Sequence, residues 1–223
     1  MSHALAIILD FDGVLLESEY EGNRHLAELL TDLGHPTSVE HALTHFIGLS
    51  GSDFIAAVED RIGAKLPPEF HERRGAEDAR ALREGVAAVT GAVEFVRSLP
   101  PDLPKAVASS SSVEWVTTHL NHLGLGTAFG RHLYSGREHV VRGKPAPDLY
   151  VYVAEQLGVP IGDCTIIEDS KVGAKGAVAS GARVIGLIAG SHCLPGHEER
   201  LRLLGVADIA RSFDEVRRLL GLR

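Results

Sequence analysis

The sequence has few cysteines and no long hydrophobic segment. Two cysteines among 223 residues are too few for a disulfide framework, so we expect a cytoplasmic protein in a reducing compartment. The apolar segment at residues 4–9 is ended by Asp10 and Asp12 and falls well short of the roughly 20 residues that a membrane span needs. It is therefore expected to be a buried strand, and no membrane partner is expected.

Positive charge is also scarce. Lys and Arg number 22 against 30 Asp and Glu, which gives a formal net charge of −8. Since contacts to phosphate groups of nucleic acid need clustered basic side chains, this balance argues against a nucleic-acid binder. Small anionic ligands remain open, because a compact site can create a local positive field whatever the net charge. The 44% of hydrophobic residues indicates a globular chain with one sizeable core.

Short apolar segments alternate with helix-like segments from about residue 91 onward. Each apolar segment ends at polar or glycine-rich residues, as buried parallel strands do. The expected strands are 5–9, 105–108, 164–167 and 183–187, with two further segments at 131–134 and 207–209; the expected helices are 92–98, 113–123, 147–157, 172–180 and 213–220. This alternation predicts an α/β fold with a doubly wound parallel sheet.

The segment at residues 18–85 has a different character. Its apolar residues recur at helical spacing, and glycines and prolines divide it into about four helices. We therefore predict a core domain formed by residues 1–17 and 86–223, and a small all-helical cap domain formed by residues 18–85. Because this insertion follows the first strand, it would lie over the carboxyl ends of the strands, where open α/β sheets bind ligands.

Acidic pairs follow two of the expected strands. Asp10 and Asp12 come after the first strand, and their side chains are expected to converge because alternate residues of extended backbone project to the same side. Glu168 and Asp169 follow the strand at 164–167. Carboxylates this close repel one another unless a cation lies between them, and oxygen ligands suit Mg²⁺. The alternative for either pair alone is a solvated turn after a strand.

A serine run and a lysine follow at other element junctions. Four serines at 109–112 precede the helix at 113–123, where hydroxyl and backbone N–H groups can bind phosphate; an ordinary helix cap is the alternative. Lys144 lies in a proline-rich segment that holds it stiffly, although by itself it would be interpreted as a surface lysine. These alternatives weaken when the ends of one parallel sheet supply Asp/Asp, Ser, Lys and Glu/Asp in that order.

In this order the motifs resemble those of the haloacid dehalogenase superfamily, and within it the capped β-phosphoglucomutase-like subfamily, in its phosphatase branch. The matching segments are DFDGVLLESE at 10–19, ASSS at 108–111, GKPAPD at 143–148 and IEDS at 167–170. The resemblance spans essentially the whole chain. It implies a Rossmann-like core with a helical cap, and an enzyme that hydrolyses phosphoric monoesters with Mg²⁺ as cofactor.

The resemblance also implies roles for individual residues. Asp10 would become an aspartyl phosphate, while Asp12 would protonate the leaving alcohol and then activate water. The implied site comprises catalytic Asp10, Asp12 and Lys144, phosphate-binding Ser109, Ser110 and Lys144, and the metal ligands Asp10, Asp12 through its backbone carbonyl, and Asp169, with Glu168 close by. Several groups must act together, because one general acid supplies only about 10²–10⁴ of the acceleration that phosphate esters need.

Three positions distinguish this sequence from a phosphosugar mutase of the β-phosphoglucomutase type. Where the mutase pattern has a cap histidine, a cap arginine and a serine-loop lysine, this sequence has Gly22, Gly51 and Ser112. Since a mutase must hold a bisphosphate at both ends, we favour a phosphatase for small phosphorylated metabolites such as sugar or sugar-acid phosphates. The mutase is the alternative. A phospho-accepting receiver domain is a third interpretation, disfavoured because a receiver has no helical lid.

Some residues receive no role from the sequence. Glu17 stands where the resembled motif has Asp, one methylene shorter. Trp115 is expected to pack within its helix, and His192 stays unassigned because a lone histidine is more often solvated than ligating. We expect a monomer or a weak homodimer.

Overall fold

A computed structural model describes residues 5–47, 49 and 51–222. Its six strands form one parallel sheet in the order β3-β2-β1-β4-β5-β6. They are β1 (Ala6–Leu9), β2 (Lys105–Ser109), β3 (Leu133–Ser135), β4 (Cys164–Glu168), β5 (Arg183–Leu187) and β6 (Asp208–Ala210). The chain moves outward from the central β1 in both directions, so the strand order reverses there, as in doubly wound sheets. The predicted parallel sheet is confirmed.

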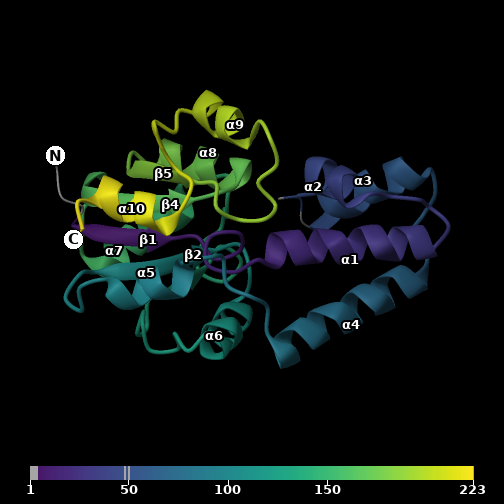
Figure 1. Cartoon of the computed structure of the whole chain (residues 1–223), viewed down its shortest axis with the longest axis horizontal. Helices are drawn as coiled ribbons and strands as arrows, with labels where there is room; N and C mark the ends of the chain where they lie inside the picture. Colours follow the sequence, from purple (N-terminus) through teal and green to yellow (C-terminus); the bar gives the residue numbers. More distant parts are fainter. Residues whose placement is uncertain (1–4, 48, 50, 223) are drawn as a thin grey trace.

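Helices cover both faces of the sheet (Figure 1). One layer consists of α5 (Ala92–Ser98), α6 (Val113–His122) and α10 (Phe213–Leu220), the other of α7 (Asp148–Leu157), α8 (Lys171–Ala179) and α9 (His197–Leu203). Side chains alternate along each strand, so Ile7 and Leu9 of β1 join the first layer while Ile8 joins the second. The sequence did not predict α9, whose seven residues bury only His197 and Leu201.

The helical segment at residues 18–85 has an apolar core of its own. Its helices are α1 (Ser18–Asp32), α2 (Val39–His45), α3 (Gly51–Ile62) and α4 (Pro68–Glu84). Leu30, Val58 and Phe70 belong to one buried cluster that excludes the sheet. The described part of this segment contains no strand, which agrees with the four-helix expectation. The division of the chain into two domains at residues 17 and 85 stays a prediction.

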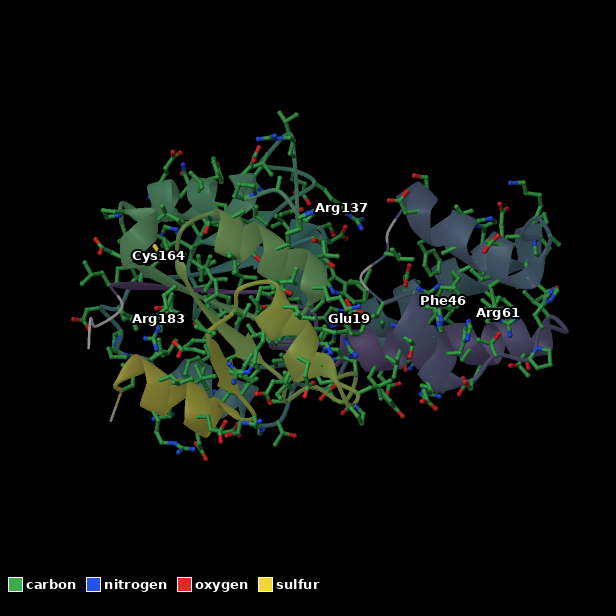
Figure 2. The ribbon with its side chains drawn as sticks, turned by 90° about the horizontal axis from the view of Figure 1, so that it is seen from above. Glu19, Phe46, Arg61, Arg137, Cys164 and Arg183 are labelled. Atoms are coloured by element: carbon green, nitrogen blue, oxygen red, sulfur yellow. The ribbon has the colours of Figure 1, made fainter. Side chains whose placement is uncertain are left out.

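These four helices lie at the carboxyl ends of the strands. Figure 1 shows α1 to α4 at one end of the sheet, with α1 beginning beside it. In Figure 2, Glu19 lies at this junction and Arg137 lies on the facing side of the core, whereas Cys164 and Arg183, which begin β4 and β5, lie at the far end. The expected position of the insertion is therefore observed. Every helix among the described residues is too short or too polar to span a bilayer.

Replacing Phe70 with alanine tests whether the four helices depend on their own core. Phe70 is 1% exposed, so we expect Phe70→Ala to lower the free energy of unfolding by about 3–5 kcal/mol through lost burial and a cavity. Urea denaturation measures the change. The control is Leu203→Ala, at a side chain that is 86% exposed, with an expected change below about 0.5 kcal/mol. Similar small effects of both variants would contradict a packed helical core.

Candidate active site

The acidic residues that follow β1 and β4 meet at the carboxyl edge of the sheet. Asp10, Glu168 and Asp169 are buried, and one carboxylate oxygen from each lies within 4.8 Å of the others. The strand pairing explains this meeting. Leu9 of β1 is paired with Ile167 of β4, so the residues that come next in the chain, Asp10 and Glu168, lie side by side. The structure thus brings together three of the four acidic side chains that the sequence singled out.

Lys144 supplies the positive charge within this acidic group. Its Nζ lies 2.7 Å from Asp10 Oδ1 and 2.6 Å from Glu168 Oε1, and its side chain is 3% exposed. The interpretation of Lys144 as a surface residue is therefore wrong. Tyr150 of α7 donates to Glu168 Oε1 at 2.8 Å, and Ser170 donates to Glu168 Oε2 from its backbone N at 2.9 Å. Both oxygens of Glu168 are thus occupied by the protein itself.

Burial and mutual repulsion act on the protonation of these carboxyls. Burial, followed by the charge of Glu168, raises the pKa of Asp10 well above its usual value, and Lys144 only partly opposes this. The same two causes raise the pKa of Asp169. Burial also opposes ionisation of Glu168, but the charge and hydrogen bond of Lys144 outweigh it and lower the pKa of Glu168. One lysine is too little charge for three ionised carboxylates.

The negative field extends to Glu19 at the start of α1. Its partly buried position, together with the charges of Asp169 and Asp12, raises the pKa of Glu19 to about 8. Like charges disfavour ionisation at one another's sites, and an added cation would relieve this. The carboxyl edge of the sheet is therefore a place that favours a bound cation.

Asp169 fits such a cation best. Its side chain is 1% exposed, and neither carboxylate oxygen accepts a hydrogen bond of regular geometry from the described residues. Its Oδ2 has a short contact of 2.7 Å with His192 Nε2, which is within ion-pair distance although it falls short of a regular hydrogen bond. Oδ1 has no polar partner of this kind. A buried carboxylate in this state is costly unless a cation compensates it.

The carboxylate of Asp12 turns away from this acidic group. Its Oδ1 accepts hydrogen bonds from Ser18 Oγ at 2.6 Å and Trp115 Nε1 at 3.0 Å. Its Oδ2 accepts from Ser111 Oγ at 2.7 Å and Ser109 Oγ at 3.2 Å. The expected convergence of Asp10 and Asp12 on one point is therefore not observed, because four donors hold Asp12 beside the serine loop. Trp115 packs against the core as expected, and its hydrogen bond to Asp12 is an addition that the sequence did not predict.

The serine loop serves several purposes at once. Ser109 is fully buried at the end of β2, while Ser110 is exposed. Ser112 caps α6 by accepting from the backbone N of Trp115 at 3.2 Å, so the alternative interpretation as a helix cap holds for this serine alone. Phosphate binding by Ser109 and Ser110 stays a prediction.

A cavity of about 870 Å³ joins these groups to the helices α1 to α4. From the core it is lined by Asp10, Ser110 and Lys144, and from the helical segment by residues that include Phe46 and Arg74. The volume exceeds that of a phosphate ion and suits a small organic phosphate. The sheet edge therefore supplies charged groups to a cavity that the helices help to enclose.

Two of the residues that sequence reasoning missed share a local position. Trp115 and Tyr150 are each the third residue of a helix, α6 and α7, that begins at the carboxyl edge of the sheet. Their position in the first helical turn after the ASSS and GKPAPD segments was the sequence signal that could have indicated a place in the site. His192 offers no such signal, because it lies in the loop after β5 and nothing nearby in the sequence indicates that this loop returns to Asp169.

The sequence model of the haloacid dehalogenase-like hydrolase family matches residues 7–187. The chain belongs to this family. This haloacid dehalogenase-like hydrolase is similar to a haloacid dehalogenase family hydrolase from Deinococcus radiodurans R1, whose crystal structure holds phosphate and sodium. The TM-score is 0.86 and the sequence identity is 32%, and the match covers 99% of this chain and 96% of that one.

Two curated relatives of this haloacid dehalogenase-like hydrolase come from Escherichia coli (strain K12). The chain is 28% identical to fructose-1-phosphate phosphatase YqaB, covering 78% of this chain and 92% of the relative. It is 26% identical to 6-phosphogluconate phosphatase, covering 87% of each. Both relatives are phosphatases, which places the chain among hydrolases of phosphoric monoesters, as the sequence motifs predicted.

Removing Lys144 tests the charge balance of the site. Lys144→Met leaves buried carboxylates without their cation, so we expect the free energy of unfolding, measured without divalent metal, to fall by about 3–5 kcal/mol. The matched control is Arg142→Met, which removes a pair with Asp148 at a side chain that is 72% exposed and should cost below about 1 kcal/mol. Equal effects of the two variants would show that the buried pairing does not support the fold.

Proposed function

We propose that this haloacid dehalogenase-like hydrolase is a Mg²⁺-dependent phosphatase that hydrolyses small sugar or sugar-acid phosphates through an aspartyl-phosphate intermediate. The observation that carries the proposal is the position of Asp10, a buried carboxylate on the cavity wall beside Lys144 and two further carboxylates. The cytoplasmic location and the monomeric or weakly dimeric state expected from the sequence stay predictions.

Asp10 is the nucleophile in this proposal. Lys144 holds its Oδ1 at 2.7 Å, while Oδ2 accepts no hydrogen bond from the described residues, which leaves an oxygen available for attack. That oxygen forms a bond to phosphorus as the bond between phosphorus and the alcohol oxygen breaks. Lys144, with Ser109 and Ser110, is proposed to bind the oxygens of the transferring phosphoryl group, and Lys144 offsets their charge. Lys144 and Ser110 line the cavity, whereas Ser109 is buried with its hydroxyl on Asp12.

Asp12 moves the proton in both steps. It gives a proton to the departing alcohol oxygen, and afterwards takes one from the water that attacks phosphorus of the aspartyl phosphate. The second attack breaks the bond between phosphorus and the Asp10 oxygen, releases inorganic phosphate and restores both carboxyls. Asp12 lines the same cavity as Asp10, which supports this division of roles.

Asp10, Asp169 and the backbone carbonyl of Asp12 are the proposed Mg²⁺ ligands, with Glu168 close by. The unpartnered oxygen of Asp169 and the excess of buried carboxylates over lysine support the fit. When bound, Mg²⁺ supplies positive charge that lets an anionic phosphate ester approach the Asp10 carboxylate.

Two arginines support a substrate with a second anionic group. Arg74 of α4 and Arg137 of the loop after β3 line the cavity, and neither has a carboxylate within 4.0 Å among the described residues. A carboxylate such as that of a sugar acid would complement them, and the 6-phosphogluconate phosphatase relative agrees with this class. A second phosphate would complement them too, so the mutase alternative needs a direct test.

The mutase positions carry no charge here. Gly22, Gly51 and Ser112 all line the cavity, whereas His25, three residues after Gly22, contacts Glu77 at 2.8 Å. This supports transfer of the phosphoryl group to water. Interconversion of hexose 1- and 6-phosphates faster than phosphate release would favour the mutase.

Substituting the nucleophile tests the proposed activity. With Mg²⁺ and either p-nitrophenyl phosphate or 6-phosphogluconate as substrate, we expect Asp10→Asn to lower kcat by about 10⁴-fold or more, because the attacking oxygen is lost. Phosphate release measures it, and circular dichroism checks that the variant folds. Wild-type turnover should also stop in EDTA. Undiminished turnover in Asp10→Asn would remove Asp10 from its role, and turnover that persists in EDTA would remove Mg²⁺.

Trp115→Phe tests whether Asp12 depends on the indole N–H. We expect kcat/KM for an alkyl phosphate to fall about tenfold, the equivalent of one lost hydrogen bond to a charged group, because a poor leaving group needs a well-placed acid. The better leaving group of p-nitrophenyl phosphate should fall much less. Val116→Ala disturbs the same helix at a residue that is 1% exposed and should affect both substrates equally. Equal losses in Trp115→Phe would contradict the dependence.

A further inference from the structure

We propose that His192 and His197 hold Asp169 in the orientation that binds the divalent cation. His192 lies in the loop after β5, and His197 is the first residue of α9. The inference rests on the proposed function, in which Asp169 is a metal ligand. Neither histidine is a ligand itself in this proposal; both are positioning residues that act through Asp169.

His192 acts on the carboxylate of Asp169. Its side chain is 0% exposed, and its Nε2 lies 2.7 Å from Asp169 Oδ2. At this distance two lone pairs would repel each other, so one of the two atoms carries a proton. The same Nε2 also lies 3.3 Å from Cys193 Sγ. The contact occupies Oδ2 and leaves Oδ1, which is buried and unpartnered, for the cation.

His197 acts on the backbone of the same residue. Its Nε2 donates to the carbonyl oxygen of Asp169 at 2.6 Å, within a buried environment. A carbonyl only accepts, so the position of the proton on Nε2 follows from the contact. Two histidines five positions apart therefore restrain both the side chain and the main chain of Asp169.

Two glycines make room for His192. A Cβ on Gly13, where φ is +86°, would collide with Asp169 Oδ2 and lie 2.9 Å from His192 Cε1. A Cβ on Gly190 would lie 2.5 Å from the same ring atom. The imidazole thus lies between two backbone segments that approach it as closely as glycine allows. This packing excludes the expectation of a solvated histidine.

Glu17 anchors the loop that carries His192. Its carboxylate accepts from the backbone N of Ser191 at 3.0 and 3.2 Å and from Ser191 Oγ at 3.2 Å. Glu17 precedes α1 and stands where the resembled motif has the shorter Asp. The contact links the connection between core and helical segment to the residue next to His192, so the loop is restrained beside Asp169.

A separate metal site is the competing interpretation of the same loop. His192, Cys193 and His197 offer three ligand atoms within 4.8 Å of one another. However, Nε2 of His192 lies closer to Asp169 Oδ2, at 2.7 Å, than to Cys193 Sγ, at 3.3 Å. Nε2 of His197 is bonded to the Asp169 carbonyl, so the contacts favour support of Asp169. Partners of this kind orient metal ligands, and their loss typically weakens metal binding 10- to 100-fold.

Calorimetric titration of the metal-stripped full chain with Mg²⁺ tests the inference. We expect His192→Phe, which keeps a ring but has no N–H, to raise the Kd for Mg²⁺ by about 10- to 100-fold. His192→Gln, which can donate from its own Nε2, should recover most of the affinity and keeps the test valid if the Phe variant does not fold. His132→Phe, at a histidine that contacts Tyr134 on β3, is the matched control and should leave the Kd unchanged.

Asp169→Asn separates failure of the inference from failure of the proposed function. If the wild type does not bind Mg²⁺, or Asp169→Asn binds it equally well, the proposed metal site is wrong. If Asp169→Asn loses binding while His192→Phe retains wild-type affinity, the inference alone is overturned. Zn²⁺ binding that Cys193→Ser abolishes, with Mg²⁺ binding of the His192 variants intact, would also overturn it in favour of a separate site.

Discussion

An excess of buried negative charge at the carboxyl edge of the sheet is the constraint on which the site depends. Asp10, Glu168 and Asp169 lie together, and the ammonium group of Lys144 pairs with Asp10 and Glu168. Carboxylates out of water are stable only with hydrogen bonds and compensating cations. Glu168 obtains both from the protein, whereas Asp10 and Asp169 remain incompletely compensated. The shortage of positive charge around Asp10 and Asp169 opposes folding, but it favours binding of a cation. A bound cation would in turn favour binding of an anionic ester.

The architecture explains why this charge can be assembled. Parallel pairing of Leu9 in β1 with Ile167 in β4 brings the residues that follow them, Asp10 and Glu168, side by side. Apolar layers on both faces keep the strands in register. The four helices α1 to α4, with a core of their own, help to enclose the cavity in which these groups lie. Enclosure excludes water and strengthens electrostatic interactions with a bound substrate.

Much of this was predictable from particular residues. The six strands and four inserted helices follow from apolar periodicity, and Asp10, Glu168 and Asp169 follow from their positions at strand ends. Expectations failed where the partner of a side chain is distant. Lys144 was placed in the site only through the resemblance, because its carboxylate partners lie 134 and 24 residues away and its own segment gives no sign of them. The Asp12 carboxylate turned to Trp115, 103 residues away, instead of to Asp10.

The sequence by itself determined the six strands, the helices other than α9, the place of the helical insertion and the residue types at the strand ends. Periodicity, turn residues and short motifs act over a few neighbouring positions, which is why these features could be predicted. Only the tertiary structure decided which of these residues touch. The four donors around Asp12, the hydroxyl of Tyr150 on Glu168 and the two histidines on Asp169 all depend on how distant segments pack. Close packing of helices and loops against the sheet, set by the whole core, selects those contacts.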